Sequence, residues 1–366
     1  MSSTIIGLGT ALPDAIVSQE DALVLAKDLC CQTPRQMRVL EEVYLKSGVQ
    51  KRSTVLQAQL DQHPEANFFQ PLSTACDTGP STAERMAIYE TKAGPLATRA
   101  CMEALNDARL NAKEITHLVT VSCTGFFAPG FDIQLVKTLP LTPDVQRTHI
   151  GFMGCHGALN ALRAANGYCS ESENNIVLIC ATEICSMHFQ YGWSKDLVVS
   201  NALFADGSAA LVLTGNRTMA NRDNRAPCMY ADAASYVIPD TENIMSWKIG
   251  NNGFVMSLDK TVAEIIETNL PRFMETWLRK NNLSIDQISG WAVHPGGPRI
   301  LEAVANALNL PADSLEASRQ ILSECGNMSS PTVLFILKHL LRSGQKPPYV
   351  VLGFGPGLTI EAALIA

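Results

Sequence analysis

The chain has little charge and no concentrated block of it. Only 17 % of its 366 residues are charged, and the formal net charge is −7. No basic tract is present of the kind that binds nucleic acid or an anionic membrane surface. No apolar run approaches the roughly 18 residues that cross a membrane. The composition therefore predicts a protein that binds neither nucleic acid nor a membrane.

Cysteine is plentiful, but the usual cysteine patterns are missing. The 11 cysteines are an odd number and include no CxxC pair. This argues against a disulfide framework or a zinc site and favours buried thiols in a reducing compartment. The first residues, MSSTIIGLGTALP, also lack the basic and apolar regions of a secretory signal peptide. We expect a cytoplasmic protein with no bound metal.

The apolar residues, 46 % of the chain, are arranged as strands that alternate with helices. Ser18 predicts the N-cap of a helix that runs through Cys30. Residues 84–110 are helical in composition, and Gly94-Pro95 predicts an interruption there. Buried strands are predicted at Thr4–Leu8, Ile115–Ser122 and Asn175–Ala181. The alternation predicts an α/β fold.

The second half of the chain repeats the first. Ile115–Ser122 aligns with Ile288–Pro295 at an offset of 288 − 115 = 173. The same offset carries Ile176–Cys180 onto Tyr349–Gly353, and the helix after Cys155 onto the helix after residue 328. Three elements at one offset predict two βαβ-rich halves packed about a pseudo-two-fold axis. We place the divide in the polar stretch NRDNRAP, which makes the halves 1–224 and 225–366.

Cys155 is the most informative single residue. It follows the apolar run Ile150–Met153 and Gly154, and it precedes a helix-forming segment. A helix N-terminus carries unpaired N–H groups and a partial positive charge, which favour a thiolate. Glycine on both sides, at Gly154 and Gly157, permits close approach of a ligand. We therefore interpret Cys155 as a nucleophile rather than a plain buried thiol.

The duplication brings two further residues toward Cys155. Asn327 lies one residue from the position that mirrors Cys155, since 155 + 173 = 328. His294 ends the strand that mirrors Ile115–Ser122. Corresponding strand ends and helix starts converge where two such halves face each other. A thiol, an imidazole and a carboxamide are therefore predicted to meet, a set suited to nucleophilic acyl chemistry.

Around these residues the chain closely resembles the type III polyketide synthases, the chalcone synthase family of the thiolase-like fold. The resemblance extends over nearly the whole chain, and SWKIGNNGF at 246–254 is more similar to the bacterial members. The motifs that carry it are GFMGCHGA, WAVHPGGPRIL, SECGNMSSPTVLFIL, GFGPGLTIE, ALFADGSAALVL and ITHLVTVSCTGFFAPGFDIQL. It implies a five-layer αβαβα architecture and a homodimer.

The resemblance also implies a reaction. Cys155 would take a starter acyl group from an acyl-CoA, and His294 would hold the sulfur as a thiolate–imidazolium pair. His294 and Asn327 would donate hydrogen bonds to malonyl-CoA while it loses CO₂, because such donors stabilise developing charge. The enolate would then extend the Cys155 thioester by Claisen condensation, and repeated extension and ring closure would give a pyrone, a resorcinol or a related aromatic product. The CoA thioesters are substrates, and no cofactor is implied.

Further site residues follow from the same resemblance. Phe204 and Phe254 match aromatic gatekeepers between the CoA tunnel and the cavity. The resemblance and the neighbouring sequence suggest that CoA contacts Lys46, Arg52, Gly296, Gly297 and Arg299. The cavity would be lined by Cys123, Thr124, His188 and Ser329, where His188 either assists cyclisation or only forms hydrogen bonds. Small residues at Ala128 and Ser200 predict a roomy cavity suited to an aliphatic starter.

Three other functions remain open at this point. A ketoacyl synthase of the fatty-acid type uses the same triad, but it normally carries an HQAN-like motif where this chain has His294-Pro295-Gly296-Gly297. A Cys/His/Asn hydrolase such as a papain-like protease has its Cys near the mature N-terminus, and it would leave the duplication unexplained. A silent paralogue would have no reason to keep all three residues.

Overall fold

The computed structural model describes residues 3–56, 68–72, 74, 77–216 and 228–366. Within them, nine strands join in one sheet of order β11-β12-β13-β8-β1-β7-β6-β4-β5. These strands are β1 (Ser3–Ala11), β4 (His117–Ser122), β5 (Gln146–Gly151), β6 (Ile176–Ile184), β7 (Asp206–Thr214), β8 (Cys228–Val237), β11 (Gly290–Val293), β12 (Tyr349–Gly355) and β13 (Thr359–Ile365).

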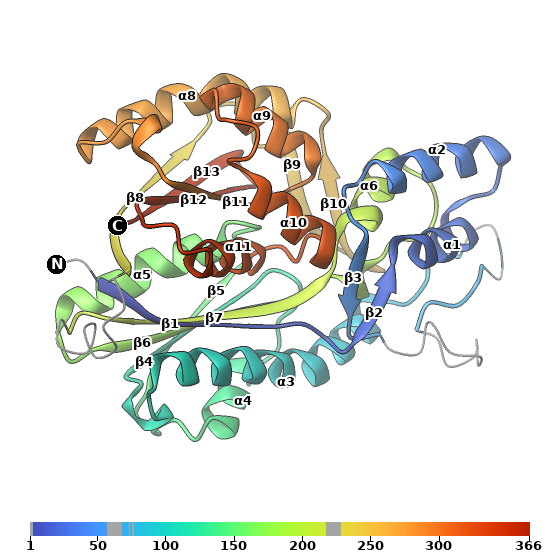
Figure 1. Cartoon of the computed structure of the whole chain (residues 1–366). Coiled ribbons are helices and arrows are strands. Elements are labelled where there is room, and N and C mark those ends of the chain that lie inside the picture. Colours follow the sequence, from blue (N-terminus) through green and yellow to red (C-terminus); the bar gives the residue numbers. More distant parts are fainter. Residues whose placement is uncertain (1–2, 57–67, 73, 75–76, 217–227) are drawn as a thin grey trace.

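The sheet folds over on itself to give the five predicted layers. Strands β1 and β8 pair over only three positions, Ser3–Ile5 against Cys228–Tyr230, so the two halves of the sheet diverge from that seam. Figure 1 shows helices between the two half-sheets and on both outer sides. The middle layer is α5 (Gly157–Glu171) and α11 (Thr332–Arg342), and the outer layers are α3 (Thr82–Ala108) with α4 (Phe131–Thr138) and α8 (Val262–Lys280) with α9 (Pro298–Leu308).

The repeat offset reappears in the strand order. Adding 173 to the start of β4 gives 117 + 173 = 290, which begins β11, and 176 + 173 = 349 carries the start of β6 to β12. The order of strands is correspondingly palindromic about the β1–β8 seam, with β4, β6 and β7 on one side matched by β11, β12 and β13 on the other. The fold class is thus confirmed. The divide at 224/225 lies outside the described residues.

The layers are held by separate apolar clusters. Helix α11 is buried over most of its surface and α5 over one broad face, and Ala158, Leu162, Val333 and Ile336 are fully covered there. Helices α3 and α8 bury one face each against the outer sides. A helix that is apolar on most of its surface belongs between two sheets, which is the position of α11.

The expected break at Gly94-Pro95 was wrong, because α3 runs unbroken through Pro95. Ala93, Ala97 and Ala100 are fully buried against the sheet, and a side chain on Gly94 would collide with Gln134 of α4. This packing on both sides outweighs the loss of one backbone hydrogen bond at proline. The predicted helix after Ser18 is confirmed as α1 (Gln19–Cys30), with the Ser18 side chain accepting the Asp21 N–H.

Some of the remaining elements form a lobe beside the layers (Figure 1), and the others connect the layers to one another. The lobe contains α1, α2 (Pro34–Leu45), α6 (Lys195–Leu203), the β2 (Ala15–Ser18) and β3 (Lys51–Thr54) pair, and the hairpin of β9 (Met245–Gly250) and β10 (Gly253–Leu258). The links are α10 (Glu316–Cys325) and the short helices η3 (Ala112–Glu114), η4 (Ser186–His188) and η5 (Ile285–Gln287). Among the described residues, no helix has the length and apolar content needed to cross a bilayer.

Candidate active site

Cys155 lies where the middle layer begins. It immediately precedes His156, the N-cap residue of α5. The chain reaches it through Gly154, which has φ +81° and would place a Cβ 2.5 Å from Pro356. Only glycine fits both conditions, because an L side chain is strained at that φ and would collide with Pro356. The turn therefore holds Cys155 against the second half of the chain.

His294 and Asn327 reach the same place from the other half. His294 follows β11, and its N–H donates to the Leu352 carbonyl at 2.8 Å. Asn327 follows α10 after Gly326, which has φ +72°. Cys155, His294 and Asn327 border one pocket of about 50 Å³. The structure thus brings together the three residues that the sequence predicted to meet.

Ser329 connects the thiol to the amide. Its hydroxyl donates to the Cys155 sulfur at 3.6 Å, and its N–H donates to Oδ1 of Asn327 at 2.8 Å. The second bond fixes the amide so that its NH₂ end remains available. Among the described residues, neither ring nitrogen of His294 has a hydrogen-bond partner. Unsatisfied buried polar groups of this kind are typical of a site that awaits a ligand.

Burial sets the resting charge of the pair. Burial raises the pKa of Cys155 to about 12, and the Ser329 hydroxyl lowers it only in part. Burial, with a smaller contribution from His156, lowers the pKa of His294 to about 3. The charged form of each group is disfavoured out of water. The resting geometry therefore favours a thiol beside a neutral imidazole, and not the thiolate–imidazolium pair that the resemblance implied.

A buried carboxylate lies beneath Cys155, and the sequence reasoning missed it. Glu183 accepts hydrogen bonds from the Thr124 and Ser330 hydroxyls, both at 2.7 Å, and from the Cys123 N–H at 2.8 Å. Burial is the largest cause of its raised pKa. A lone acidic residue in the otherwise apolar strand β6 was the available signal. Glu183 ties β4 to the segment that follows Asn327.

Cys123 and Thr124 lie in the wall of a second small pocket beside Cys155, together with Ser329. The Cys123 sulfur accepts the Gly154 N–H at 3.1 Å. The Thr124 hydroxyl donates to Glu183 and accepts from the Ile184 N–H at 2.9 Å. Both residues therefore support the turn that carries the nucleophile.

His188 is locked in place. One ring nitrogen bonds the Thr124 carbonyl at 2.6 Å, the other accepts the Phe254 N–H at 3.0 Å, and the ring stacks on Phe254 at 4.3 Å. Burial lowers its pKa to about 3. A neutral imidazole with both nitrogens engaged has no proton to exchange. Of the two roles left open for His188, the geometry favours hydrogen bonding over assistance of cyclisation.

The two predicted gatekeepers lie at different depths. Phe204 borders both small pockets at Cys155 and a further cavity beyond them. Phe254 is buried and borders only the further cavity, packed between His188 and the ring of Trp247. Of the two predicted gatekeepers, Phe204 is therefore the one that lies beside the thiol.

The cavity beside Cys155 is narrow, in contrast to the roomy one predicted. Met245, Trp247 and Met256 of the β9–β10 hairpin fill the space, and the two pockets that touch Cys155 measure about 50 and 30 Å³. Ala128 lies elsewhere, in a separate pocket at the β4–α4 loop. Sequence spacing could not show this, because the filling side chains come from a hairpin about 90 residues after Cys155.

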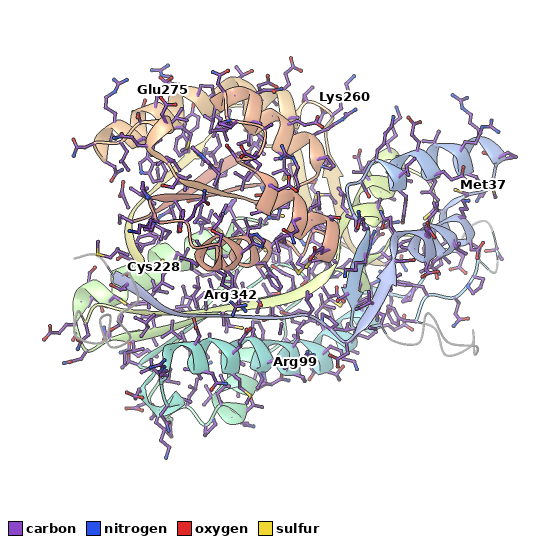
Figure 2. The ribbon with its side chains drawn as sticks, viewed as in Figure 1. Met37, Arg99, Cys228, Lys260, Glu275 and Arg342 are labelled. Atoms are coloured by element: carbon purple, nitrogen blue, oxygen red, sulfur yellow. The ribbon has the colours of Figure 1, made fainter. Side chains whose placement is uncertain are left out.

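A cavity of about 480 Å³ lies outside the pocket that holds the triad, and the two share Gly296 and Ile300. Lys46, Gly297 and Arg299, which the sequence predicted to contact CoA, all border this cavity. Two lysines that the sequence reasoning missed, Lys195 and Lys260, border it as well. Lys260 projects outward at the start of α8 (Figure 2). These four cations come from four separate elements, so no run of basic residues could mark the site. We call Lys46, Lys195, Lys260 and Arg299 the basic rim.

Arg52 is the exception among the predicted CoA contacts. It is only 7 % exposed, and its guanidinium donates to the backbone carbonyls of Asn201, Ala202 and Phe204 and to the Gln19 side chain. Its charge is therefore used to hold the end of α6, and it does not face the basic rim. The sequence predicted that Arg52 contacts CoA because its segment is polar. In the structure, strand β3 directs the Arg52 side chain into the protein instead.

The geometry defines a class of enzyme. A half-buried thiol at a helix start, an imidazole and a carboxamide meet between two duplicated halves, beneath a mouth with basic side chains. This is the arrangement of a thiolase-like condensing enzyme. Residues 2–217 match the family model of the N-terminal domain of chalcone and stilbene synthases, and residues 230–366 match that of the C-terminal domain. The chain belongs to the chalcone and stilbene synthase family and is a type III polyketide synthase.

Individual relatives agree with this assignment. The chain is 30 % identical to 1,3,6,8-tetrahydroxynaphthalene synthase of Streptomyces peucetius subsp. caesius, over 99 % of this chain and 93 % of the relative. It is also 30 % identical to the alpha-pyrone synthesis polyketide synthase-like Pks18 of Mycobacterium tuberculosis, over 98 % and 89 %. Among solved structures, PKS-I of the brown alga Ectocarpus siliculosus is 31 % identical with a TM-score of 0.91, covering 100 % of this chain and 98 % of that one.

Proposed function

We propose that Cys155 is the nucleophile of this polyketide synthase and that His294 and Asn327 handle malonyl-CoA. The Cys155 sulfur attacks the thioester carbonyl of an acyl-CoA and passes its proton to the neutral His294, and CoA leaves as the thiol once it regains a proton. The observation that carries this is that Cys155, His294 and Asn327 border one pocket.

Extension uses the donors that remain unpaired. Malonyl-CoA loses CO₂, and the enolate oxygen that forms accepts hydrogen bonds from the Asn327 NH₂ group and an N–H of His294. The enolate carbon attacks the Cys155 thioester, the C–S bond breaks, and the chain on CoA is two carbons longer. Its return to Cys155 starts the next cycle, and ring closure releases a pyrone, a resorcinol or a related aromatic product.

The basic rim is the proposed site of the CoA phosphates. Lys46, Lys195, Lys260 and Arg299 border the outer cavity, and Gly296 and Gly297 allow the pantetheine arm to pass. Glu42, Asp196 and Asp259 border it too, so the rim is not a purely cationic surface. Four cations on separate elements can surround a phosphate group in a way that a single basic helix cannot.

We also propose a homodimer that works in the cytoplasm. Strand β5 is the last strand of the sheet, and among the described strands only β4 pairs with it. Beside this open edge, Phe126, Phe152 and Met153 are 54 %, 40 % and 39 % exposed. An open edge with exposed aromatic residues is suited to a second copy. The ten cysteines that the structure describes are all free thiols, which fits a reducing compartment.

A product screen tests the reaction. The purified protein is given malonyl-CoA with a panel of acyl-CoA starters, and products are identified by mass spectrometry. We expect products heavier than the starter by successive two-carbon ketide units, lost in Cys155→Ala and kept in Cys169→Ala, which changes a buried cysteine of α5, the helix that follows Cys155. Free acids without extension would indicate a thioester hydrolase instead, and silence with every starter would contradict the proposal.

A further inference from the structure

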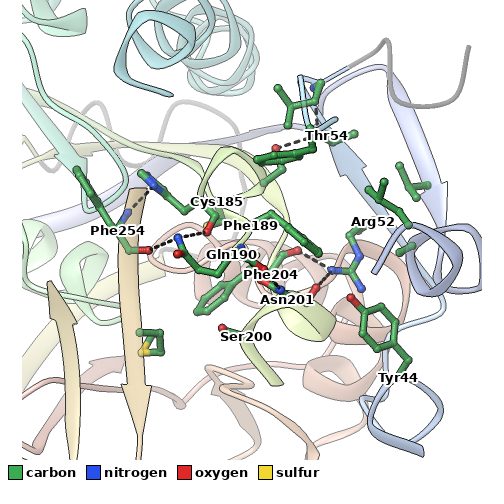
Figure 3. Close-up of a pocket in the computed structure, with 18 of the residues that line it drawn as sticks. Tyr44, Arg52, Thr54, Cys185, Phe189, Gln190, Ser200, Asn201, Phe204 and Phe254 are labelled. Carbon is green, nitrogen blue, oxygen red and sulfur yellow. Dashed lines mark hydrogen bonds between the residues drawn. The ribbon is translucent and has the colours of Figure 1, made fainter. Parts of the chain in front are cut away.

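A second cavity lies beyond Phe204, between the active site and the lobe of α1 and α2 (Figure 3). Phe204 and Met256 border this cavity and both pockets at Cys155, and Ser200 borders it and the pocket with His294. Only side chains therefore separate the nucleophile from this space. Met256 is unbranched and flexible, so it can turn aside for a chain attached to Cys155. We call this space the lobe cavity.

The lobe cavity is apolar over most of its wall. Leu25 of α1, Leu56, Phe69 and Phe189 border its far part, and the aromatic rings of Phe204, Trp247 and Phe254 border the near part. Such a lining favours a hydrocarbon over a charged nucleotide. The lobe cavity shares no lining residue with the outer cavity, and none of the four rim cations borders it, so we do not assign it to CoA.

Most polar side chains in this wall already satisfy one another. The Thr54 hydroxyl donates to Ser186 at 2.9 Å, and the Asn201 NH₂ donates to the Gln190 carbonyl at 2.9 Å. Both nitrogens of His188 are engaged, as described above. A ligand gains nothing from these groups, because each would have to give up a bond that it already makes.

Two buried donors in the wall are exceptions. Among the described residues, the Tyr44 hydroxyl and Nε of Arg52 have no hydrogen-bond partner. Both residues border the lobe cavity, and Figure 3 shows them side by side with the Tyr44 hydroxyl turned toward the guanidinium. Burial raises the pKa of Tyr44, so the hydroxyl keeps its proton. The four groups that accept from Arg52 are uncharged carbonyl or amide oxygens, so no carboxylate bonds it directly, although the charge of Asp206 acts on it and Asp21 borders the same cavity.

We propose that the lobe cavity receives the far end of the starter acyl group, and that this end carries an acceptor oxygen bound by Tyr44 and Arg52. The starter is thus an acyl group with an apolar body and a hydroxyl or a carboxylate at its tip. Both donors are satisfied by one such oxygen, whereas a plain hydrocarbon leaves them unpaired. This inference rests on the proposed function, because the acyl group must be attached to Cys155.

Matched starters test the oxygen. Hexanoyl-, octanoyl- and decanoyl-CoA are compared with their ω-hydroxy and ω-carboxy analogues, with malonyl-CoA as extender. We expect one oxygenated starter to exceed its plain counterpart in kcat/KM by about tenfold, the discrimination of one buried hydrogen bond. The hydroxyl and carboxyl series show which oxygen is recognised. Equal kcat/KM for plain and oxygenated starters of every length would overturn the inference.

Two variants locate the binding. Tyr44→Phe removes only the unpaired hydroxyl, so we expect it to fold normally and to lose most of the preference in kcat/KM for an oxygenated starter over its plain counterpart. Ala22→Phe fills the lobe cavity from α1 and should raise KM for long starters over short ones. Val24→Phe is the control, since Val24 lies on the same helix and is 60 % exposed. A preference that survives in Tyr44→Phe would overturn the inference.

The two levels of proposal fail in different ways. If no starter is extended by the wild-type protein, the proposed function fails and the inference falls with it. If starters are extended but Ala22→Phe and Val24→Phe give the same length dependence, only the lobe cavity is wrong. If the oxygen preference and the length dependence are both found, density for the tip of a co-crystallised oxygenated starter beside Tyr44 would be the direct support.

Discussion

Phe204 and Asn327 are joined through their backbones, although they are 123 residues apart. The Asn327 N–H donates to the Leu203 carbonyl and the Ala205 N–H donates to the Asn327 carbonyl, both at 2.9 Å. This short parallel bridge ties the residue that separates the cavities to a proposed catalytic amide. A shift of the α6 end therefore moves both, so that the width of the passage and the position of the amide are set together.

The resting protonation of Cys155 predicts how its reactivity depends on pH. With a pKa of about 12, the thiolate fraction should rise about tenfold per pH unit across neutral and mildly alkaline pH, without a plateau. The rate of alkylation by iodoacetamide, followed at the Cys155 peptide by mass spectrometry, measures this. Ser329→Ala should slow alkylation further, because the hydroxyl lowers the pKa. A plateau below pH 7 would instead establish a resting thiolate–imidazolium pair.

The two deeply buried histidines predict a loss of stability in acid. Burial lowers the pKa of His188 to about 3 in the folded state from its ordinary value of 6.5, so below pH 6.5 the unfolded chain binds a proton that the folded chain does not. Stability is therefore present above pH 6.5 and is lost as the pH falls toward 3. At pH 5 the loss from this residue is about 2 kcal/mol.

The measurement is urea unfolding of wild type and His188→Gln at pH 7 and pH 5. Glutamine offers one donor and one acceptor in place of the imidazole and does not titrate. We expect the variant to lose about 2 kcal/mol less than wild type between the two pH values. Equal losses would mean that His188 is protonated, or solvated, in the folded protein.

The hydrogen bonds that Glu183 accepts predict that Glu183→Gln lowers both stability and activity. Glu183→Gln puts an NH₂ group among donors that need an acceptor, so at least one of Thr124, Ser330 and the Cys123 N–H loses its partner. We expect a loss of about 2–4 kcal/mol in the free energy of unfolding and a slower condensation, read from urea midpoints and product yield. Glu173→Gln, at an exposed position, should change stability by less than about 0.5 kcal/mol. Equal behaviour of the two variants would contradict the role given to Glu183.

If the basic rim binds CoA, removing one of its cations should raise KM without changing kcat. Lys195→Ala and Arg299→Ala each remove one cation from the outer cavity. We expect KM for malonyl-CoA to rise about three- to tenfold with kcat nearly unchanged, and the effect to shrink in high salt. Lys280→Ala, at the exposed far end of α8, serves as the control. A fall in kcat at constant KM would place these residues in the chemistry instead.

The open edge at β5 predicts where the dimer can be broken. Phe126→Asp and Phe152→Asp put charge on the exposed aromatic patch, and we expect a shift toward monomer in analytical ultracentrifugation. Leu45→Asp changes a side chain that is 84 % exposed on α2, and it should leave the assembly unaltered. A dimer that resists both phenylalanine substitutions would place the interface elsewhere.

Local sequence patterns predicted much of the fold, because helix capping and the burial of apolar strands depend on residues that are close together in the chain. The Ser18 side chain accepts a backbone N–H at the start of α1, which is why serine marks a helix start in the sequence. The apolar runs at β4 and β6 are buried, as their composition predicts. The helix α3 is the counterexample. Proline is unfavourable inside an isolated helix, but the packing of Ala93, Ala97 and Ala100 against the sheet decides the outcome.

The sequence by itself determined the duplicated α/β fold, the meeting of Cys155, His294 and Asn327, and the family. These follow from a repeat offset, from residues placed at strand ends and helix starts, and from motifs that are continuous in the chain. Only the tertiary structure decided the neutral resting pair at Cys155, the inward turn of Arg52, the basic rim and the lobe cavity. Each of these depends on which side chains from distant elements exclude water from one another, and burial of that kind is a property of the packed molecule.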